Sequence, residues 1–310
     1  MALRAVAVAA PDAGRDKEGV ARMDQRVGLI GFGAMGTALA DLLGATGSRP
    51  LVFDTHPVAI ARAQGAGLDT AGSAAEIAER CDVIDLIVRT DEDVLAAVSG
   101  PEGIAGGAHP GSTLIVMSTV SLPTTLAVGE IMESRGGAAF DACPTERPGG
   151  VLAGQNVFLA GGPEALVERF RPHLLRMARE VILMGPPGAG SAAKMVHNLL
   201  PGAERLVLHE ALLIGEAAGL PYVRVLNMLR DTWLTETPLL AEWETVFDPT
   251  GTDPTPKAGS NVLAKDVPLA AELARSRGVD APIIFAMARS GLALVDAATR
   301  KADGAGSGQR

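Results

Sequence analysis

The sequence predicts an α/β domain with a mostly parallel sheet, followed by an all-α C-terminal domain. Short apolar runs alternate with helical patterns from Arg26 to Gly185, and only helical patterns follow. Strands that alternate with helices are typical of a parallel sheet with right-handed crossovers. A cluster of glycines and prolines at 185–190 marks a joint between the two parts. The predicted division is a disordered extension at 1–25, the α/β domain at 26–185, the helical domain at 186–300 and a tail at 301–310.

Seven short runs are the predicted strands, and most are apolar from end to end, as expected for strands buried on both faces. The predicted strands are Val27–Gly31, Leu51–Asp54, Val83–Val88, Thr113–Met117, Ala139–Ala142, Val157–Ala160 and Val181–Met184. Helical periodicity fills the sequence between them. The predicted helices of this part are Ala34–Gly44, Pro57–Gly65, Ser73–Arg80, Glu92–Val98, Pro123–Ser134 and Pro163–Phe170.

A long helical pattern, Ser191–Gly219, opens the second part. It is apolar nearly all round, which is typical of a helix buried on most sides. Such a helix would lie between domains or be shared with a second subunit, so we expect a homodimer or homotetramer. Pro201 and Gly202 interrupt the pattern and should bend the helix one turn after Asn198. Further helices are predicted at Tyr222–Thr232, Asn261–Ser276 and Pro282–Thr299.

Composition argues against several classes of partner. The 310 residues suggest two domains, and the formal net charge of −9 disfavours binding to nucleic acid or to an anionic membrane, because both need basic surfaces. No apolar run approaches the ~18 residues that span a bilayer. The two cysteines, Cys81 and Cys143, are too few for a disulfide framework and fit a reducing cytoplasm. Acidic residues within the first 24 argue against a targeting peptide, so we expect a disordered extension there or a true start at Met23.

A glycine motif directly follows the first strand. Gly31, Gly33 and Gly36 form G-x-G-x-x-G, with Met35 at its last variable position, between an apolar strand and a helix. Gly31 permits a tight turn, Gly33 lets the backbone approach a pyrophosphate, and Gly36 lets the helix pack closely on the strand. The amides at the helix N-terminus then face the phosphates. An unliganded strand–helix turn is the alternative, but the context predicts a Rossmann dinucleotide site.

Asp54 ends the second strand, 23 residues after Gly31. A carboxylate at this spacing can accept hydrogen bonds from the ribose hydroxyls of NAD and would repel the 2′-phosphate of NADP. No arginine follows it directly, because Thr55, His56 and Pro57 come next. An ordinary aspartate at a strand end is the alternative. The residue therefore favours NAD over NADP as the cofactor, and we expect no metal.

Three polar residues lie together on the long helix. Lys194, His197 and Asn198 stand at i, i+3 and i+4, so they share one face. Polar groups on an otherwise apolar helix cost free energy unless they have partners. From these residues alone, one interpretation is a lysine that extends to solvent beside a satisfied core histidine. The other interpretation is a catalytic cluster.

Four motifs together resemble the β-hydroxyacid dehydrogenases, the family that contains 3-hydroxyisobutyrate dehydrogenase and 6-phosphogluconate dehydrogenase. The resemblance covers about Val27 to Thr299 and its motifs come in the family's order. They are Gly31-x-Gly33-x-Met35-Gly36, Met117-Ser118-Thr119-Val120-Ser121, Gly188-x-Gly190 followed by Lys194 and Asn198, and Lys265-Asp266. The Lys-Met-Val-His-Asn form of the third motif is that of the 6-phosphogluconate branch.

The resemblance implies roles for these residues. Lys194 would be the general base that takes the proton of a β-hydroxyl while hydride passes to NAD, and Asn198 would hydrogen-bond the substrate near the reacting centre. A lysine with its ordinary pKa of about 10.4 is a poor base at neutral pH, but burial in an apolar helix lowers that pKa. Lys265 would close over the cofactor, although it could instead be a surface lysine. The remaining implied contacts are Ser121 and His197 with the substrate, and Thr119 with the nicotinamide end.

Two segments depart from the family pattern. Where the family usually has Ser-Gly-Gly, whose serine and backbone amides grip the substrate carboxylate, this chain has Thr145, Glu146 and Arg147. Thr145 can keep the hydroxyl contact, and Arg147 could clamp a carboxylate. Glu146 could pair with Arg147 or bind the hydroxyls of a sugar acid, and a reshaped surface loop with an ion pair is the alternative. The segment Val88-Arg89-Thr90 lies where the family often has Leu-Pro, which adds a charge near the cofactor end of the sheet, and we place Thr90 on the cofactor side.

We therefore expect an NAD-dependent cytoplasmic oxidoreductase that oxidises the β-hydroxyl of a small hydroxy acid or sugar acid. Two other functions stay open from the sequence. An imine reductase or reductive aminase shares this architecture but usually lacks the lysine, and a non-catalytic NAD-binding protein need not keep both Lys194 and Asn198. Decarboxylation after oxidation, as in the 6-phosphogluconate branch, is a variant that His197 leaves open. The altered loop favours a substrate more polar than 3-hydroxyisobutyrate.

Overall fold

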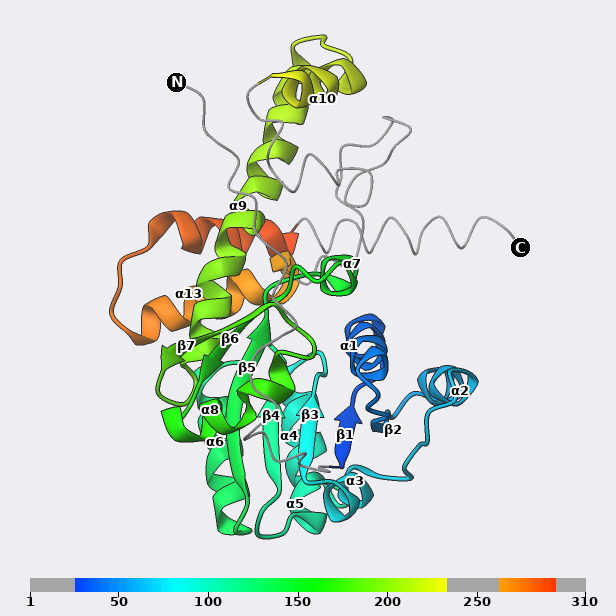
Figure 1. Ribbon diagram of the computed structural model, residues 1–310. Helices are drawn as coiled ribbons and strands as arrows, with labels where there is room; N and C mark the ends of the chain where they lie inside the picture. The colour runs from blue at the N-terminus through cyan, green and yellow to red at the C-terminus, as the bar shows by residue number, and fades with distance from the viewer. Residues whose placement is uncertain (1–25, 233–261, 294–310) are drawn as a thin grey trace, which may run out of the picture.

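The computed structural model describes residues 26–232 and 262–293 (Figure 1). The predicted N-terminal extension and C-terminal tail lie outside these residues, as do Asn261 and the end of the helix predicted at 282–299. Among the described residues, no helix combines the length and the apolar character needed to cross a membrane.

A seven-stranded sheet forms the N-terminal part, in the order β2-β1-β3-β4-β5-β6-β7. Strands β1 to β5 are parallel to one another, β6 is antiparallel to β5, and β7 is parallel to β6. This arrangement confirms the mostly parallel sheet. An antiparallel neighbour needs no crossover helix, and β5 and β6 are joined through a single short helix. The strands are β1 Val27–Ile30, β2 Leu51–Phe53, β3 Val83–Leu86, β4 Thr113–Val116, β5 Ala138–Pro144, β6 Val157–Gly161 and β7 Glu180–Gly185.

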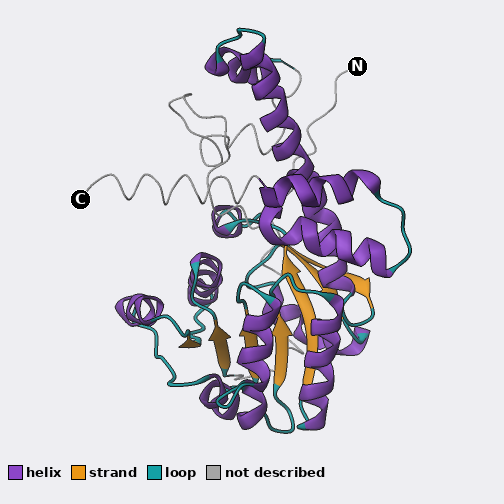
Figure 2. Cartoon of the chain, turned by 180° about the vertical axis from the view of Figure 1, so that it is seen from behind, coloured by secondary structure: helices purple, strands orange, loops and turns teal. Residues whose placement is uncertain are grey.

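Helices cover both faces of the sheet (Figures 1 and 2). All six helices predicted for this part are present, and the structure adds two short ones, α5 and α7. The helices are α1 Ala34–Ala45, α2 Pro57–Gly65, α3 Ala74–Arg80, α4 Asp91–Ser99, α5 Ile104–Gly107, α6 Leu122–Ser134, α7 Pro148–Leu152 and α8 Glu164–Leu174.

Buried apolar clusters hold these helices on the sheet. On one face, Phe140 of β5 and Phe170 of α8 lie with ring centroids 6.0 Å apart in a fully buried cluster. On the other, Ile77 of α3, Ile84 of β3 and Val128 of α6 are fully buried together. A sheet packed on both faces is a rigid platform, and in such sheets ligands bind at the carboxyl ends of the strands.

The described chain beyond β7 is helical. Helix α9, Ala189–Ala217, rises from the carboxyl end of the sheet and carries α10, Tyr222–Asp231, at its far end (Figure 1). The helix predicted at Asn261–Ser276 begins instead with a π-helical turn, η1 Val262–Asp266, which α13 Val267–Ser276 continues. Residues 282–293 form one further helix.

Helix α9 continues through Pro201 as one helix, so the proline does not end it, and the predicted bend stays a prediction. The neighbouring Gly202 packs closely against α13. It packs so tightly that a Cβ there would lie 2.7 Å from Val267 Cγ2 of α13. This packing supports the turn in which the proline removes a backbone hydrogen bond.

Candidate active site

The turn between β1 and α1 has the backbone geometry of a dinucleotide site. Gly31 has a φ of 96°, and a Cβ there would overlap the main-chain oxygen of Ile87. A Cβ at Gly36 would overlap the main-chain oxygen of Gly31, whereas no atom lies within 4 Å of the Cβ position of Gly33, the N-cap residue of α1. Met35 packs against the apolar cluster beneath. Open space at a helix N-terminus is what a pyrophosphate requires, so this turn fits a dinucleotide.

A cleft of about 990 Å³ opens beside this turn, and its wall includes Gly31, Gly33 and Asp54. Asp54 Oδ2 accepts a hydrogen bond of 2.7 Å from the N–H of Phe32, and its Oδ1 accepts one of 2.8 Å from the N–H of His56. The carboxylate therefore braces the glycine turn while it lines the cleft. Each oxygen keeps acceptor capacity for a ribose hydroxyl.

Arg62 of α2 also lines the cleft, although no sequence pattern indicated it. Its guanidinium lies 5.4 Å from the ring centroid of Phe32 and donates a hydrogen bond to the main-chain oxygen of that residue. The sequence shows no arginine directly after Asp54, but the second turn of α2 returns Arg62 to the same cleft. This cleft therefore carries charges of both signs.

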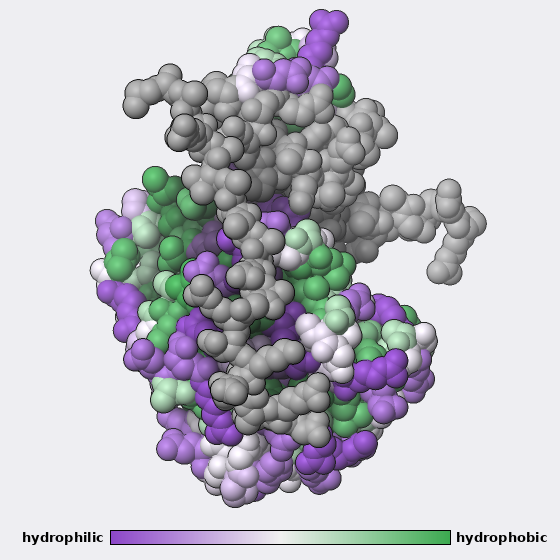
Figure 3. Space-filling model, viewed as in Figure 1, coloured by the Kyte–Doolittle hydropathy of each residue, from purple (hydrophilic) through white to green (hydrophobic). Residues whose placement is uncertain are grey.

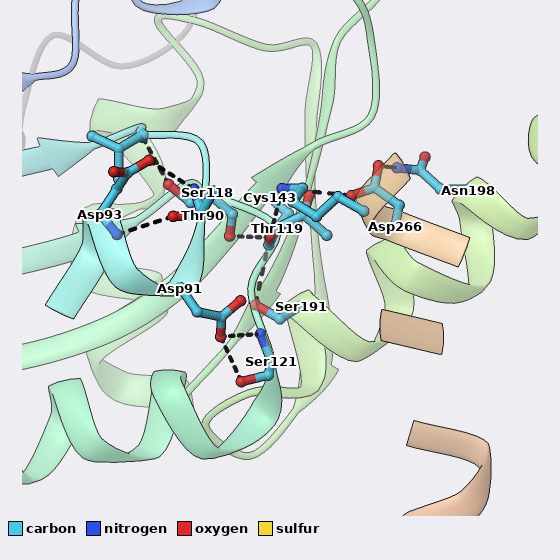
Figure 4. A network of polar contacts seen from close by, with 12 residues as sticks. Thr90, Asp91, Asp93, Ser118, Thr119, Ser121, Cys143, Ser191, Asn198 and Asp266 are labelled. Carbon is cyan, nitrogen blue, oxygen red and sulfur yellow. Dashed lines mark hydrogen bonds and ion pairs between the residues drawn. The ribbon is translucent and has the colours of Figure 1, made fainter. Parts of the chain in front are cut away.

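Hydrogen bonds from side chains join the loop after β3 to the loop after β4 (Figure 4). Ser118 Oγ accepts a hydrogen bond of 2.8 Å from the N–H of Val88. Ser121 Oγ donates to Asp91 Oδ1 at 2.5 Å, and the N–H of Ser121 donates to the same oxygen at 2.9 Å. Ser121, a predicted substrate contact, thus also caps α6 and joins the two loops. Asp91 was not predicted, because its partner lies 30 residues away.

Thr90 caps α4 at the cofactor end of the sheet. Its hydroxyl accepts a hydrogen bond of 3.1 Å from the N–H of Asp93, whose Oδ2 in turn accepts one of 3.1 Å from the N–H of Thr90. Arg89, immediately before it, lines the cleft together with Asp93. Thr90 therefore fixes the start of the helix, while Arg89 supplies charge to the cleft.

Lys194 is buried in the second turn of α9, with 8% of its surface exposed. Its Nζ donates a hydrogen bond of 3.0 Å to the main-chain oxygen of Thr145, so the side chain does not extend to solvent. Burial lowers the pKa of Lys194 below the ordinary value of an amine, against the opposing charges of Asp266 and Glu146. An amine with a lowered pKa loses its proton more readily, which makes it a better general base than an ordinary lysine.

Asp141, on β5, holds the start of α9 in place. Its Oδ1 accepts a hydrogen bond from the N–H of Gly188 and its Oδ2 accepts one from the N–H of Ser191, each 2.7 Å long. A Cβ at Gly190 would lie 2.7 Å from Oδ2, so the glycine lets the strand and helix approach. Burial raises the pKa of Asp141 to about 6, although both hydrogen bonds lower it. This anchor sets the position of the helix turn that carries Lys194.

Asn198, one turn after Lys194, is also buried, with 6% of its surface exposed. Its Nδ2 donates a hydrogen bond of 2.6 Å to Asp266 Oδ2 (Figure 4). Its Oδ1 lies 3.0 Å from His197 Nδ1. Burial raises the pKa of Asp266. The structure thus places Lys194 and Asn198 in the interior and leaves His197 exposed beside them.

Lys265 extends from η1 to the edge of the sheet. Its Nζ donates a hydrogen bond of 2.7 Å to the main-chain oxygen of Thr119, in the loop after β4, and lies 3.5 Å from Asp266 Oδ1. A π-helical turn is rare and is frequent at functional sites. Here it places two adjacent side chains, Lys265 and Asp266, so that one contacts Thr119 and the other contacts Asn198.

Thr145 follows β5 and was predicted to offer its hydroxyl to a substrate. Its Oγ1 accepts a hydrogen bond of 3.1 Å from the N–H of Val157, which joins the end of β5 to β6. Its main-chain oxygen holds Lys194. The hydroxyl keeps its own proton for donation.

Glu146 and Arg147 complete the segment that departs from the family pattern. Arg147 is the exposed N-cap residue of α7. Glu146 is half-buried, and its carboxylate lies over Gly150, where a Cβ would overlap Oε2. Among the described residues no hydrogen bond or ion pair engages this carboxylate, so the pairing of Glu146 with Arg147 considered from the sequence is absent there.

Two family models match most of the chain. The model described as the NAD binding domain of 6-phosphogluconate dehydrogenase matches residues 26–185. The model described as the NAD-binding domain of NADP-dependent 3-hydroxyisobutyrate dehydrogenase matches residues 188–306. The cofactor is therefore a nicotinamide dinucleotide, NAD with NADP as the second choice.

Named relatives cover most of the chain. The mitochondrial 3-hydroxyisobutyrate dehydrogenase of Homo sapiens is 30% identical over 256 residues, which is 81% of this chain and 76% of that protein. The NAD-dependent L-serine dehydrogenase of Pseudomonas aeruginosa is 27% identical over 265 residues, 84% of this chain and 88% of that protein.

Solved structures share the fold. The 3-hydroxyisobutyrate dehydrogenase of Mycobacterium tuberculosis, solved with L-serine, is 26% identical with a TM-score of 0.70, covering 86% of this chain and 92% of that one. An imine reductase of Streptomyces aurantiacus is 16% identical with a TM-score of 0.60, covering 88% and 95%. At that identity the likeness shows the fold alone.

Proposed function

The chain belongs to the β-hydroxyacid dehydrogenase family, and from this premise we propose that it oxidises the β-hydroxyl of a small hydroxy acid or sugar acid, with NAD as hydride acceptor and Lys194 as general base. One observation carries the proposal. Lys194 is buried with a lowered pKa, and its Nζ lies at the main chain of Thr145, the segment where the family grips its substrate.

In the proposed reaction Lys194 enters unprotonated and takes the proton of the substrate hydroxyl. The nicotinamide, when bound, accepts the hydride from the carbinol carbon. A neutral amine can keep one N–H on the Thr145 oxygen while its lone pair accepts the proton. Burial has already removed water from the amine of Lys194. Water molecules around the base therefore need not rearrange when it takes the proton.

Asn198 is proposed to hydrogen-bond the substrate beside Lys194. Asp266 orients the side-chain amide of Asn198, because its carboxylate accepts a hydrogen bond from Nδ2. This contact prevents the amide from turning over, so the oxygen stays on the other side, near His197. The remaining proposed substrate contacts are Ser121, Thr145, Arg147 and His197.

The dinucleotide is proposed to occupy the cleft beside the glycine turn. Asp54 would bind the ribose hydroxyls, and the open space at Gly33 would receive the pyrophosphate. Asp54 also supports NAD over NADP, because a carboxylate repels a 2′-phosphate. The other proposed cofactor contacts are Gly31, Met35, Gly36, Thr90, Thr119 and Lys265.

The test is NADH formation, followed by absorbance, against a panel of β-hydroxy acids and sugar acids, with NAD and with NADP. We expect at least one acid to be oxidised, with a higher kcat/KM for NAD than for NADP. Lys194→Ala protein purified in the same way controls for contaminating dehydrogenases. If no acid gives NADH although NAD binds, the proposed activity is wrong.

We also infer that copies of the chain associate along α9. Leu200, Val207 and Ile214 follow one another at seven-residue spacing and are 76%, 65% and 71% exposed. Apolar residues at this spacing share one helix face, and an exposed apolar stripe usually marks a contact. Figure 3 shows further apolar residues at the left, where α13 lies in Figure 1. Sedimentation velocity should show a dimer or tetramer that Val207→Glu weakens, and a wild-type monomer would contradict the inference.

A further inference from the structure

Arg62 is a cation in the wall of the dinucleotide cleft to which the proposed function gives no role. It lies in the second turn of α2, is exposed, and lines the same cleft of about 990 Å³ as Gly33 and Asp54. Two contacts with Phe32 hold its guanidinium, which donates a hydrogen bond to the main-chain oxygen and lies 5.4 Å from the ring centroid. Because Phe32 is only 1% exposed, the support is rigid and the positive charge has a fixed place in the cleft.

Arg62 and Asp54 contact the backbone of the same residue. Asp54 Oδ2 accepts a hydrogen bond of 2.7 Å from the N–H of Phe32, whereas Arg62 donates to the main-chain oxygen of Phe32. Within the described part of the chain the two side chains form no ion pair, and the guanidinium makes no other hydrogen bond. An arginine has five N–H donors, so most of them stay available to a ligand beside the proposed ribose acid.

A phosphate on the 2′-oxygen of the ribose would meet both charges. Such a group carries about −1.5 to −2 at pH 7, so Asp54 repels it and Arg62 attracts it. A guanidinium can bind a phosphate through two parallel hydrogen bonds, which makes the attraction specific as well as strong. The ribose of NAD has only a hydroxyl there and gains little from the cation. Arg62 therefore acts on one cofactor and hardly on the other.

A second arginine, Arg89, lines the same cleft from another side. It follows β3, whereas Asp54 follows β2, and β1 lies between these two strands in the sheet. Neighbouring strands are 4.7–4.9 Å apart, so the ends of β2 and β3 are separated by roughly 10 Å. Arg89 is thus a cation of the same cleft whose strand lies away from the proposed ribose acid.

We propose that Arg62 is a second determinant of cofactor choice, which binds a 2′-phosphate on the ribose and reduces the preference for NAD that Asp54 alone would give. The inference rests on the proposed place of the dinucleotide in this cleft, and it depends neither on the oxidation nor on Lys194. In the wild type the attraction and the repulsion nearly offset each other. We expect the Kd for NADP to lie within about tenfold of the Kd for NAD.

Fragments of the cofactor test the 2′-position without any turnover. Adenosine 2′,5′-bisphosphate and adenosine 3′,5′-bisphosphate carry the same charge and differ only in the place of one phosphate. Isothermal titration calorimetry with the full chain should give a Kd at least about tenfold lower for the 2′,5′-isomer. In Arg62→Ala the two isomers should bind equally. An equal Kd for the two isomers in the wild type would overturn the inference.

Three variants assign the effect to Arg62 in titrations with the whole cofactors. Arg62→Ala should raise the Kd for NADP by about tenfold or more and the Kd for NAD by less than about threefold. Arg62→Lys keeps the charge without the planar fork and should recover part of the affinity for NADP. Arg89→Ala is the matched control and should change both Kd values by the same factor. Thermal melts followed by circular dichroism check that each variant is folded.

A combined variant separates binding of the phosphate from support of Phe32. Asp54→Ala leaves the cation unopposed and should bind NADP at least as tightly as NAD, whereas Asp54→Ala with Arg62→Ala should lose this gain for NADP. Added salt should weaken NADP more than NAD in the wild type, because exposed charges are screened, and equally in Arg62→Ala.

The outcomes for the two cofactors distinguish this inference from the proposed site. An equal loss of affinity for NAD and NADP in Arg62→Ala would show that the residue only supports Phe32, which overturns the inference and leaves the proposed cleft standing. If the wild type binds neither cofactor, the proposed cleft and the inference fall together. An acid panel that gives no NADH contradicts the proposed oxidation and leaves these Kd ratios as they are.

Discussion

Lys265 and Thr119 are separated by 146 residues, yet the lysine ammonium donates a 2.7 Å hydrogen bond to the main-chain oxygen of the threonine. The donor belongs to the π-helical turn η1 and the acceptor to the loop after β4. This bond joins the helical region to the carboxyl edge of the sheet, where parallel sheets bind their cofactors. The cation therefore lies beside the proposed nicotinamide end of the dinucleotide.

Replacing Lys265 should weaken NAD binding. In Lys265→Ala the cation and its contact with Thr119 are lost, and hydrogen bonds from charged groups contribute roughly 1.5–3 kcal/mol, so we expect the Kd for NAD to rise about tenfold or more. Lys265→Arg keeps the charge and a donor and should retain most of the affinity. Isothermal titration calorimetry measures both. An unchanged Kd in Lys265→Ala would show that this lysine does not bind the cofactor.

Lys194→Ala should abolish turnover while leaving NAD affinity nearly intact. A positioned general base contributes roughly 10²–10⁴-fold. The side chain lies at Thr145 and is not among the residues that line the cleft beside the glycine turn. Lys194→Arg should be as inactive, because a guanidinium keeps the positive charge but does not deprotonate. The two variants together separate proton transfer from simple charge. A Lys194→Ala enzyme that keeps more than about a tenth of the wild-type rate would contradict the assignment.

Local pattern predicted the sheet and its glycine turn well. Continuous apolar runs located all seven strands, and β1, β4 and β6 are buried along their whole length, as that signature predicts. The edge strand β7 is the exception, because Ile182 and Met184 are exposed there. The turn at Gly31 was predictable for a similar reason, since its φ of 96° admits little but glycine. The boundary between the two parts at residue 185 stays a prediction, although the strands do end there.

The unpredicted features of the site depend on contacts between distant residues. Asp91 holds Ser121 across 30 positions, and Asp266 holds Asn198 across 68. No spacing of residues in the sequence predicts such pairs, because they form only when two distant segments meet in the fold. Arg62 was missed for a related reason, since helix geometry and not adjacency brings it back to the cleft.

Asp54→Ala should weaken NAD more than NADP. The carboxylate lines the cleft and is the proposed acceptor for the ribose hydroxyls, whereas it repels a 2′-phosphate. The ratio of the Kd for NADP to the Kd for NAD should therefore fall by about tenfold. Asp54→Asn removes the charge but keeps one acceptor for the N–H of Phe32 or His56. It therefore distinguishes the effect of the charge on cofactor binding from the effect of the hydrogen bonds that hold the turn. An equal loss for both cofactors would assign Asp54 a structural role only.

Asp141 should make folding stability depend on pH in an unusual direction. Burial raises its pKa from 3.8 to about 6, so the folded protein holds a proton in this interval that the unfolded chain has lost. The contribution of Asp141 to the free energy of unfolding therefore decreases as pH rises from 3.8 to about 6. Above this interval the contribution no longer changes with pH. The shift corresponds to about 3 kcal/mol.

Asp141→Asn should remove this pH dependence, because an amide does not titrate. The free energy of unfolding of the wild type minus that of the variant should fall by about 3 kcal/mol as pH rises through the interval. Urea unfolding followed by circular dichroism at several pH values measures the difference. Ser191→Ala is the control, since it keeps the main-chain N–H that Asp141 accepts and should follow the wild type. A difference that stays constant with pH would mean that Asp141 is already ionised throughout, and that the two N–H donors at the start of α9 outweigh its burial.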